Sequence, residues 1–242
     1  MSLLETRGVT VRFGGTTAVD AVDLALESGQ VTGLIGPNGA GKTTLFNVIT
    51  GMQRPTSGSV LLDGSDITRK SPGKRGRLGV ARTFQRLELF LSLSVRDNVR
   101  VAGDIVKASR RGGYDVEAET QRVLELTGLA EIADREVADI PTGRARVVEV
   151  ARALMTHPRL LLLDEPASGQ TEQETEVFAA MLRALADDGL GICLVEHDLS
   201  LVMSLCRTIH VLDRGRLIAS GTPDEVRATP EVVAAYIGAE VI

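Results

Sequence analysis

A glycine-rich segment near the N-terminus constrains the fold of this chain more than any other feature. It reads Gly36-Pro37-Asn38-Gly39-Ala40-Gly41-Lys42-Thr43 and matches the pattern G-x-x-x-x-G-K-[ST]. An apolar run, Val31 to Ile35, precedes it, and a helix-like stretch, Thr43 to Ile49, follows it. Glycines let the backbone curl until successive N–H groups point at one spot at a helix N-terminus, which forms a nest for an anion. The segment therefore predicts a strand, a phosphate-binding loop and a helix in succession, and with them a site for a nucleoside triphosphate.

The side chains of this loop fit such a site. Lys42 can reach the β- and γ-phosphates, and the hydroxyl of Thr43 can bind Mg²⁺. The residues expected to hold the nucleotide here are Gly36, Pro37, Asn38, Gly39, Ala40, Gly41, Lys42, Thr43 and Thr44.

A second apolar run ends in two acids. Leu160 to Leu163 predicts a strand that is buried on both faces, as in a parallel sheet, and Asp164 and Glu165 follow it. The acids then lie at the carboxyl end of the strand, where doubly wound sheets place their ligands. Asp164 suits the Mg²⁺ shell, and Glu165 is placed to orient or deprotonate a water that attacks the γ-phosphate. The alternative is a strand followed by an ordinary acidic turn.

A third apolar run, Ile192 to Val195, ends just before Glu196 and His197. His197 stands where a sensor of the γ-phosphate would be useful, although a lone histidine at the end of a strand is often only structural. No second His or Cys lies at ligand spacing, so we do not expect His197 to bind a metal.

Together these segments resemble the ATP-binding subunits of ABC transporters, and the resemblance covers nearly the whole chain. In Val11 to Gly15, Phe13 resembles the aromatic residue that stacks on adenine. In Arg82 to Gln85, Gln85 resembles the glutamine that touches Mg²⁺ and the attacking water. The resemblance implies ATP and Mg²⁺ as cofactors. It implies Glu165, His197 and Gln85 as catalytic residues, with His197 as the switch histidine, and Thr43, Gln85 and Asp164 as ligands of Mg²⁺.

A further segment, Ile140 to Arg144, is similar to the signature motif of that family, which usually reads L-S-G-G-Q, and a helical run from Val147 to Met155 follows it. The resemblance implies that Thr142 and Gly143 bind nucleotide together with a partner subunit. Pro141 replaces the usual serine and so removes a hydroxyl and a backbone N–H donor. Thr142 restores one hydroxyl only if it faces the nucleotide.

The loop from Ala167 to Thr171 resembles the segment that crosses to the partner subunit. Gln170 and Thr171 replace the usual apolar residue and acid, and these replacements bear on communication between the two ATP sites.

Three segments are similar to the ATPases of branched-chain amino acid importers, namely Gly79 to Gln85, Val95 to Val99 and Gly221 to Gly238. The resemblance implies an ATP-hydrolysing subunit that powers import of branched-chain amino acids or similar polar solutes. It implies a second ATPase subunit, in a homodimer or a heterodimer, transmembrane permease subunits and, through them, a solute-binding protein as partners. It implies a cytoplasmic location, peripheral on the inner face of the cell membrane through the permeases.

Other functions stay open at this point. A non-transport ABC-type ATPase of DNA repair or translation usually carries a second ATPase domain, a long coiled coil or a zinc module, and the sequence has none of these. An ABC transporter for another substrate class is a second alternative. A P-loop kinase is a third, and it would need a nucleoside or sugar pocket but neither the signature segment nor the switch histidine.

Composition narrows the partners further. The net charge is −5, and seven aromatic residues with no Trp offer no base-stacking platform, so we expect no nucleic-acid partner. The basic run from Arg69 to Arg77 is a local exception, and we interpret it as a solvated loop, with contacts to membrane partners or lipid headgroups as the alternative.

Cys193 and Cys206 lie among apolar residues and are expected to be buried, reduced thiols. The N-terminus lacks the features of a signal peptide, and no apolar stretch is long enough to cross a bilayer.

The expected fold class is α/β, a P-loop NTPase core with a mostly parallel sheet, an N-terminal antiparallel β layer and an inserted α-helical subdomain. We expect one domain, residues 1–242, with the nucleotide-binding core in 1–85 and 158–242 and the helical and signature subdomain in about 86–157. Gly112-Gly113 separates two expected helices of that subdomain, and Pro223 and Pro230 open two more near the C-terminus. The expected strands of the first zone are Val9–Phe13, Ala21–Leu26, Val31–Ile35, Ser59–Asp63 and Leu78–Phe84, and the expected helices of the second are Val95–Ala108 and Val116–Leu126.

Overall fold

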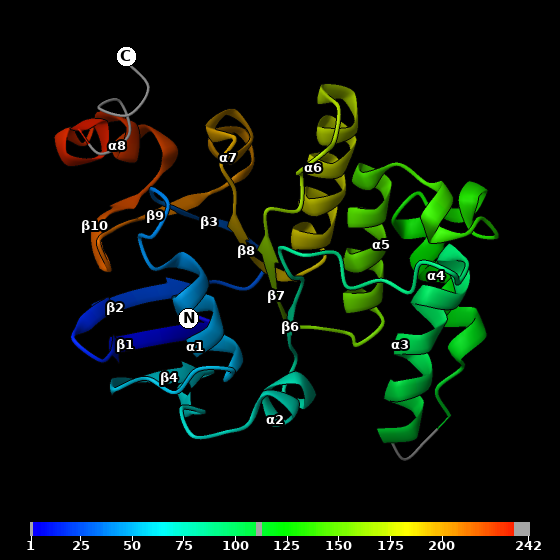
Figure 1. Ribbon diagram of the computed structural model, residues 1–242, viewed down its shortest axis with the longest axis horizontal. Helices are drawn as coiled ribbons and strands as arrows, with labels where there is room; N and C mark the ends of the chain where they lie inside the picture. The colour runs from blue at the N-terminus through cyan, green and yellow to red at the C-terminus, as the bar shows by residue number, and fades with distance from the viewer. Residues whose placement is uncertain (1, 110–112, 235–242) are drawn as a thin grey trace.

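Two β-sheets and a cluster of helices make up the computed structural model, which describes residues 2–109 and 113–234 (Figure 1). In the described residues, the antiparallel sheet has the order β2-β1-β4-β5 and the larger sheet has the order β10-β9-β3-β8-β7-β6. The strands are β1 (Leu4–Phe13), β2 (Thr16–Leu26), β3 (Val31–Ile35), β4 (Ser57–Leu62), β5 (Ser65–Asp66), β6 (Val80–Arg82), β7 (Leu160–Asp164), β8 (Gly191–Val195), β9 (Thr208–Asp213) and β10 (Arg216–Gly221).

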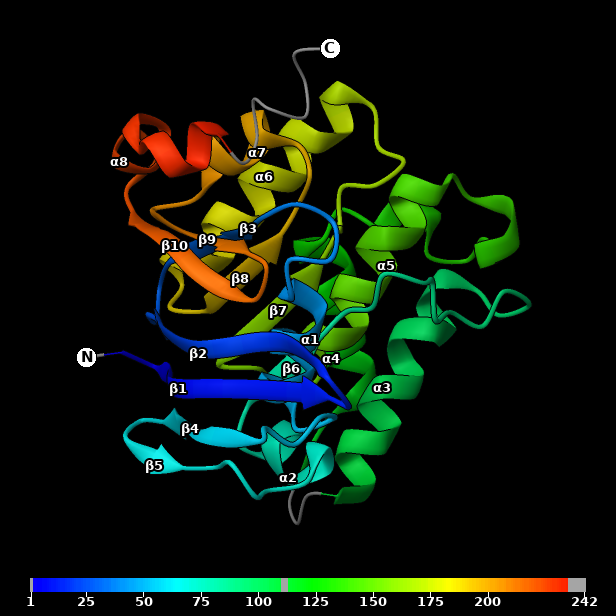
Figure 2. The same ribbon diagram turned by 60° about the vertical axis from the view of Figure 1, so that its left-hand side comes forward.

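The larger sheet is parallel from β9 through β6, and only the hairpin of β9 and β10 is antiparallel. Its central strands are fully buried, as the runs of leucine, isoleucine and valine predict. Side chains alternate between the two faces of a strand. Leu161 and Leu163 therefore join one hydrophobic core with α5 (Thr142–Leu154), α6 (Glu172–Asp187) and α7 (Leu199–Leu205). Leu160 and Leu162 join a second core with α1 (Lys42–Thr50) and the antiparallel sheet. Figure 2 shows the antiparallel sheet lying below the larger one.

The described helices are α1 (Lys42–Thr50), α2 (Pro72–Arg77), α3 (Val95–Ser109), α4 (Val116–Leu126), α5 (Thr142–Leu154), α6 (Glu172–Asp187), α7 (Leu199–Leu205) and α8 (Pro223–Ala228), with short 3-10 turns at Ala130–Ile132 and Val137–Asp139. Helices alternate with strands along the described chain, except where α3, α4 and α5 follow one another. Figure 1 shows α3, α4 and α5 gathered beside the larger sheet, at the end away from β10. None of the described helices combines the length and the apolarity that a membrane crossing requires.

The structure confirms the predicted fold class. The predicted helix over 116–126 is observed with the same bounds, whereas β1 begins earlier than predicted and β6 is shorter. The helix α8 begins at Pro223, as predicted, and Thr222 caps it in a capping box with Glu225. Residues 230–234 are also helical, as predicted from Pro230. Cys193 and Cys206 are both buried and free, as expected. Of the predicted glycine break, Gly112 lies outside the described residues.

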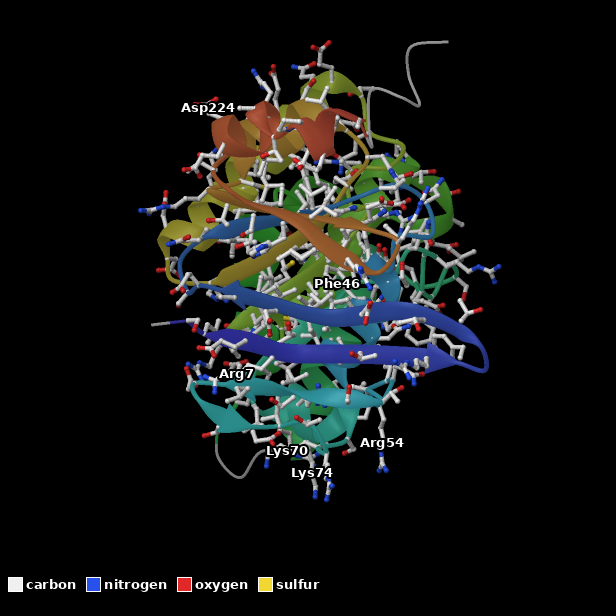
Figure 3. The ribbon with its side chains drawn as sticks, turned by 90° about the vertical axis from the view of Figure 1, so that its left-hand side faces the viewer. Arg7, Phe46, Arg54, Lys70, Lys74 and Asp224 are labelled. Atoms are coloured by element: carbon white, nitrogen blue, oxygen red, sulfur yellow. The ribbon has the colours of Figure 1, made fainter. Side chains whose placement is uncertain are left out.

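The basic run is not the solvated loop that we expected, because it contains α2 and a buried arginine. Lys70 and Lys74 do extend from the surface, as Figure 3 shows at the lower edge of the molecule. Arg75 points inward and is 1% exposed. Its guanidinium donates to the carbonyls of Val48 and Ile49 (both 2.6 Å) at the C-terminal end of α1, and also to those of Thr68 and Lys70. Carbonyls at a helix C-terminus lack partners within the helix and carry the negative end of its dipole, so a cation stabilises them.

Arg75→Met is therefore expected to destabilise the fold by about 3 kcal/mol, because buried carbonyls lose their donors. The midpoint of urea unfolding should fall while its slope stays unchanged. Lys74→Met is the matched control, since Lys74 is the preceding residue of the same helix and is exposed. Equal unfolding midpoints for the two variants would contradict the role of Arg75.

Candidate functional site

The loop between β3 and α1 adopts a backbone that only glycine accommodates at two places. A Cβ on Gly36 would lie 2.1 Å from the carbonyl oxygen of Leu212, and a Cβ on Gly41 would lie 2.4 Å from that of Ala18. Gly41 is also the N-cap of α1, in the left-handed region with φ 107°, and it supplies no side-chain acceptor. The first N–H groups of α1 are thus left for an external anion.

Lys42 closes this loop from within. Its Nζ donates to the carbonyl oxygens of Gly36 (2.5 Å) and Pro37 (3.1 Å), and its side chain is buried. Burial lowers the pKa of Lys42, and the negative charges of Glu165 and Asp164 act in the opposite direction. A phosphate in the loop would offer this cation charged acceptors in place of two carbonyls.

Three of the predicted catalytic side chains meet at one oxygen atom. Oε1 of Glu165 lies 2.8 Å from Nε2 of His197 and accepts a hydrogen bond from Nε2 of Gln85 at 3.1 Å. Glu165 has φ 52°, in the left-handed region, and its N–H donates to the carbonyl of Val195 (2.8 Å). A non-glycine residue held in this region carries strain, which is typical of functional sites. The geometry lets Glu165 act as a base while Gln85 and His197 hold it.

A pocket of about 260 Å³ collects most of the predicted site. Its lining from the predicted set consists of Asn38, Gly39, Ala40, Gly41, Lys42, Thr43, Thr44, Gln85, Asp164, Glu165 and His197. Gly36 and Pro37 belong to the base of the loop through their bonds to Lys42. Phe13, Thr142 and Gly143 do not line this pocket.

Those three residues lie elsewhere. Phe13 ends β1 and is 51% exposed. Thr142 is exposed at the start of α5, and Gly143 packs so closely on the loop before α6 that a Cβ would lie 2.8 Å from Cγ of Gln170. The phosphate-binding loop and the segment that resembles the signature motif thus do not share a pocket within one chain.

The pocket also offers the donors that Mg²⁺ prefers. Thr43, Gln85 and Asp164 supply a hydroxyl, an amide and a carboxylate to the same space, and Mg²⁺ takes oxygen ligands while retaining waters and phosphates. No group of three His, Cys, Asp or Glu side chains within the described part of the chain could hold a metal. The residues therefore fit a metal that is shared with a nucleotide rather than held by a cage of protein ligands.

Sequence reasoning missed how α5 holds the loop that carries Gln85. Arg146 donates to the carbonyls of Phe84 (3.0 Å) and Gln85 (2.5 Å), and Glu149 accepts from the N–H of Glu88 (2.9 Å). One turn further along α5, Arg152 donates to the carbonyl of Glu88. The spacing of charged residues at 146, 149 and 152, on a helix that is mostly buried, is the signal that could have revealed this role.

Two other residues at the site were also missed. Glu196 accepts from the N–H of Ala167 (2.7 Å) and of His197 (3.1 Å), so it joins the loop after Glu165 to the loop of the histidine. Burial raises the pKa of Glu196. The other is Arg82, which forms an ion pair of 2.9 Å with Asp164.

The replaced residues of the crossing loop have local structural roles. Thr171 is the N-cap of α6, where its hydroxyl accepts from the N–H of Glu174, whose carboxylate accepts from the N–H of Thr171. Gln170 packs on Gly143, as described above, and donates to the carbonyl of Pro166 (3.3 Å).

Comparisons with known proteins place the chain among transport ATPases. A family model described as ABC transporter matches residues 19–168, and one described as branched-chain amino acid ATP-binding cassette transporter matches residues 216–242. The high-affinity branched-chain amino acid transport ATP-binding protein BraF of Pseudomonas aeruginosa is 40% identical, over 98% of each chain. LivG of Escherichia coli, described in the same words, is 37% identical over 98% of each chain. The crystal structure of the ADP conformation of MJ1267, an ATP-binding cassette of an ABC transporter, superposes with a TM-score of 0.88 at 31% identity, over 98% of this chain and 99% of that one.

Proposed function

This chain belongs to the ATP-binding subunits of ABC transporters, and we propose that it hydrolyses ATP to power an importer of branched-chain amino acids. The observation that carries the proposal is the single pocket in which the phosphate-binding loop faces Asp164 and the cluster of Glu165, Gln85 and His197. A P-loop kinase would need a pocket for a nucleoside or sugar beside the nucleotide, and it would not need the signature segment.

The residues of the pocket divide the chemistry between them. In our proposal the loop N–H groups and Lys42 bind the phosphates of ATP, and Thr43, Gln85 and Asp164 hold Mg²⁺, which neutralises phosphate charge when bound. Glu165 orients the attacking water and accepts its proton. The water oxygen forms a bond to the γ-phosphorus while the bond to the β–γ bridging oxygen breaks, which gives ADP and phosphate. His197 and Gln85 hold Glu165 in place for this step. Phe13, exposed at the end of β1, is proposed to stack on the adenine.

The nucleotide site alone does not determine the solute. The ribose import ATP-binding protein RbsA 1 of Rubrobacter xylanophilus is also 34% identical to this chain, which spans 47% of that protein. Support for branched-chain amino acids comes instead from the C-terminal match over residues 216–242 and from relatives such as BraF and LivG that share the full length.

A group of exposed apolar side chains lies in the segment that follows Gln85 and on α3. Leu87, Phe90, Leu91 and Ile105 are large apolar side chains that are exposed. They come from the loop that α5 holds and from α3, and a pocket of about 200 Å³ lined by Phe84, Glu88 and Arg152 lies in the same region. Exposed apolar groups of this size on one region mark protein contacts. We propose that permeases bind here and hold the chain at the cytoplasmic face of the membrane, with a solute-binding protein acting through them.

We further propose a single ATPase domain, in which the helical part, about 86–157, presents α5 to a second ATPase subunit. The N-terminal N–H groups of α5 at Thr142 and Gly143 would bind the γ-phosphate of the partner's nucleotide, whereas Pro141, the N-cap, has no N–H to donate. Each missing charge-assisted bond forfeits roughly 1.5–3 kcal/mol. A heterodimer confines that loss to one of two sites, so we propose a heterodimer.

The purified chain is therefore expected to hydrolyse ATP slowly and to speed up when a second ATPase subunit and the permeases are added. Turnover measured against protein concentration, with and without these partners in liposomes, tests the proposal. Transport of leucine into the liposomes, with a solute-binding protein present, tests the substrate class. Full activity of this chain alone, rising with the square of its concentration, would show that a homodimer suffices. A complex that hydrolyses ATP but moves no branched-chain amino acid would contradict the substrate.

A further inference from the structure

Arg82 is a buried cation behind the proposed catalytic site, in contact with Asp164. It ends β6, and its Nη2 lies 2.9 Å from Oδ2 of Asp164, with only 5% and 3% of the two side chains exposed. The other oxygen of Asp164, Oδ1, forms no hydrogen bond with any described residue, and Asp164 lines the nucleotide pocket. One carboxylate oxygen is thus occupied from behind while the other is available to the pocket.

The guanidinium of Arg82 is itself held on several sides. Its Nη1 donates to Oδ1 of Asn47 at 2.6 Å. Its central carbon lies 5.4 Å from the ring centroid of Phe46 and 5.2 Å from that of Phe84, so aromatic faces flank it. Figure 3 shows Phe46 in the interior of the molecule. The planar guanidinium donates to two anchors, Asp164 and Asn47, and therefore has little freedom to rotate.

These anchors belong to the segments that carry the three candidate metal ligands. Asn47 lies four residues after Thr43 on α1, and so on the same face of that helix. Asp164 ends β7, which pairs with β6, and Arg82 itself precedes Gln85 by three residues. One side chain therefore joins α1, β7 and the loop of Gln85 directly behind the pocket.

We propose that Arg82 is a positioning residue that sets the spacing of Thr43, Asp164 and Gln85 and so determines how tightly the site holds a divalent cation with its nucleotide. The inference rests on the proposed function. Residues behind metal ligands orient them, and their loss typically lowers metal affinity about 10–100-fold.

Charge and geometry predict opposite results for this residue. By charge alone, removal of the positive charge of Arg82 beside Asp164 would strengthen the binding of the metal ion. By geometry, loss of the group that holds Asp164 in position would weaken the binding of the metal ion. Arg82→Lys keeps the charge, but a lysine ammonium cannot donate to Asp164 and Asn47 at the same time in the geometry of the guanidinium. Arg82→Met removes the charge and keeps much of the length of the side chain.

Mn²⁺ titration followed by electron paramagnetic resonance measures the metal site directly, in chains that carry Glu165→Gln so that ATP is not consumed. We expect Mn²⁺ affinity in the presence of ATP to fall about 10–100-fold in Arg82→Lys, with Arg82→Met at least as weak. Binding of a fluorescent ATP analogue in EDTA should change less than about threefold, because the phosphate-binding loop is intact. Arg77→Met, an exposed arginine on α2, is the matched control and should match the parent in both measurements.

Thermal melting of each variant identifies those that remain folded, and Arg82→Lys keeps the test valid if Arg82→Met does not fold. Parental Mn²⁺ affinity in folded Arg82→Lys would overturn the proposal, and so would tighter Mn²⁺ binding in Arg82→Met, which would mean that Arg82 acts by charge alone. If the Glu165→Gln parent itself binds neither the analogue nor Mn²⁺, the proposed function fails rather than this inference.

Discussion

Glu165→Gln is expected to lower ATP hydrolysis about 10²–10⁴-fold while ATP remains bound, the range typical for loss of a positioned base. Oε1 of Glu165 contacts both Gln85 and His197, and a glutamine of the same shape can retain contacts at that position. An amide cannot accept the proton of the attacking water, so only the chemical step is lost. Release of phosphate under single-turnover conditions measures the loss, and titration of a fluorescent ATP analogue with Mg²⁺ shows that binding persists.

Glu172→Gln is the matched control, because it makes the same change from carboxylate to amide outside the pocket. Glu172 is an exposed acid in the first turn of α6. It should hydrolyse ATP at the normal rate. His197→Ala should also slow turnover without preventing binding, since Glu165 would lose one of the groups that hold it. Normal hydrolysis in Glu165→Gln would mean that another residue activates the water, and the role given to Glu165 would be wrong.

The parts of the site that could be predicted are those encoded in a few neighbouring residues. A buried strand that ends in a glycine-rich loop or in two acids has a local signature, and parallel strands bring their carboxyl ends to one edge of a sheet. For this reason Lys42, Asp164, Glu165 and His197 meet in one pocket although they come from distant parts of the chain.

The residues that escaped prediction act over long distances along the chain. Arg75 reaches the end of α1, Arg82 reaches Asp164, and Arg146 reaches the loop of Gln85. Arginines usually face water, and nothing in the immediate neighbours of Arg75 and Arg82 shows that they find carbonyls or a carboxylate inside the fold. For Arg146, the spacing with Glu149 and Arg152 on α5 indicates a buried polar face but does not identify the loop that it contacts. We misinterpreted the basic run around Arg75 for this reason, since its two basic neighbours on α2, Lys74 and Arg77, are exposed and only Arg75, which is directed at α1, is buried.

The positive φ of Glu165 is likewise invisible in the sequence. No glycine marks the position, and the turn is held by a hydrogen bond to Val195 on the adjacent strand. Only the assembled sheet supplies that partner.

Lys42→Ala is expected to abolish binding of ATP at working concentrations. Nζ of Lys42 now rests on the carbonyls of Gly36 and Pro37 and lies within the loop that is proposed to take the phosphates. Losing charge-assisted bonds to the β- and γ-phosphates costs about 3–6 kcal/mol, at roughly 1.5–3 kcal/mol for each bond. That loss weakens binding about 10²–10⁴-fold. Titration of a fluorescent ATP analogue, with protein melting followed in parallel, measures the effect.

Two further variants separate the cation from the rest of the site. Lys107→Ala removes an exposed lysine of α3 and should bind the analogue normally. Phe13→Ala should weaken binding by only about 1–2 kcal/mol, the scale of one stack between a base and an aromatic ring. We therefore expect affinity for the ATP analogue to be by far the lowest in Lys42→Ala, moderately reduced in Phe13→Ala and normal in Lys107→Ala. The reason is that the phosphate contacts are charged and enclosed by the loop, whereas Phe13 is half exposed. Near-normal affinity for the analogue in a folded Lys42→Ala protein would contradict the phosphate-binding role of this loop. It would also contradict the assignment of ATP to this pocket.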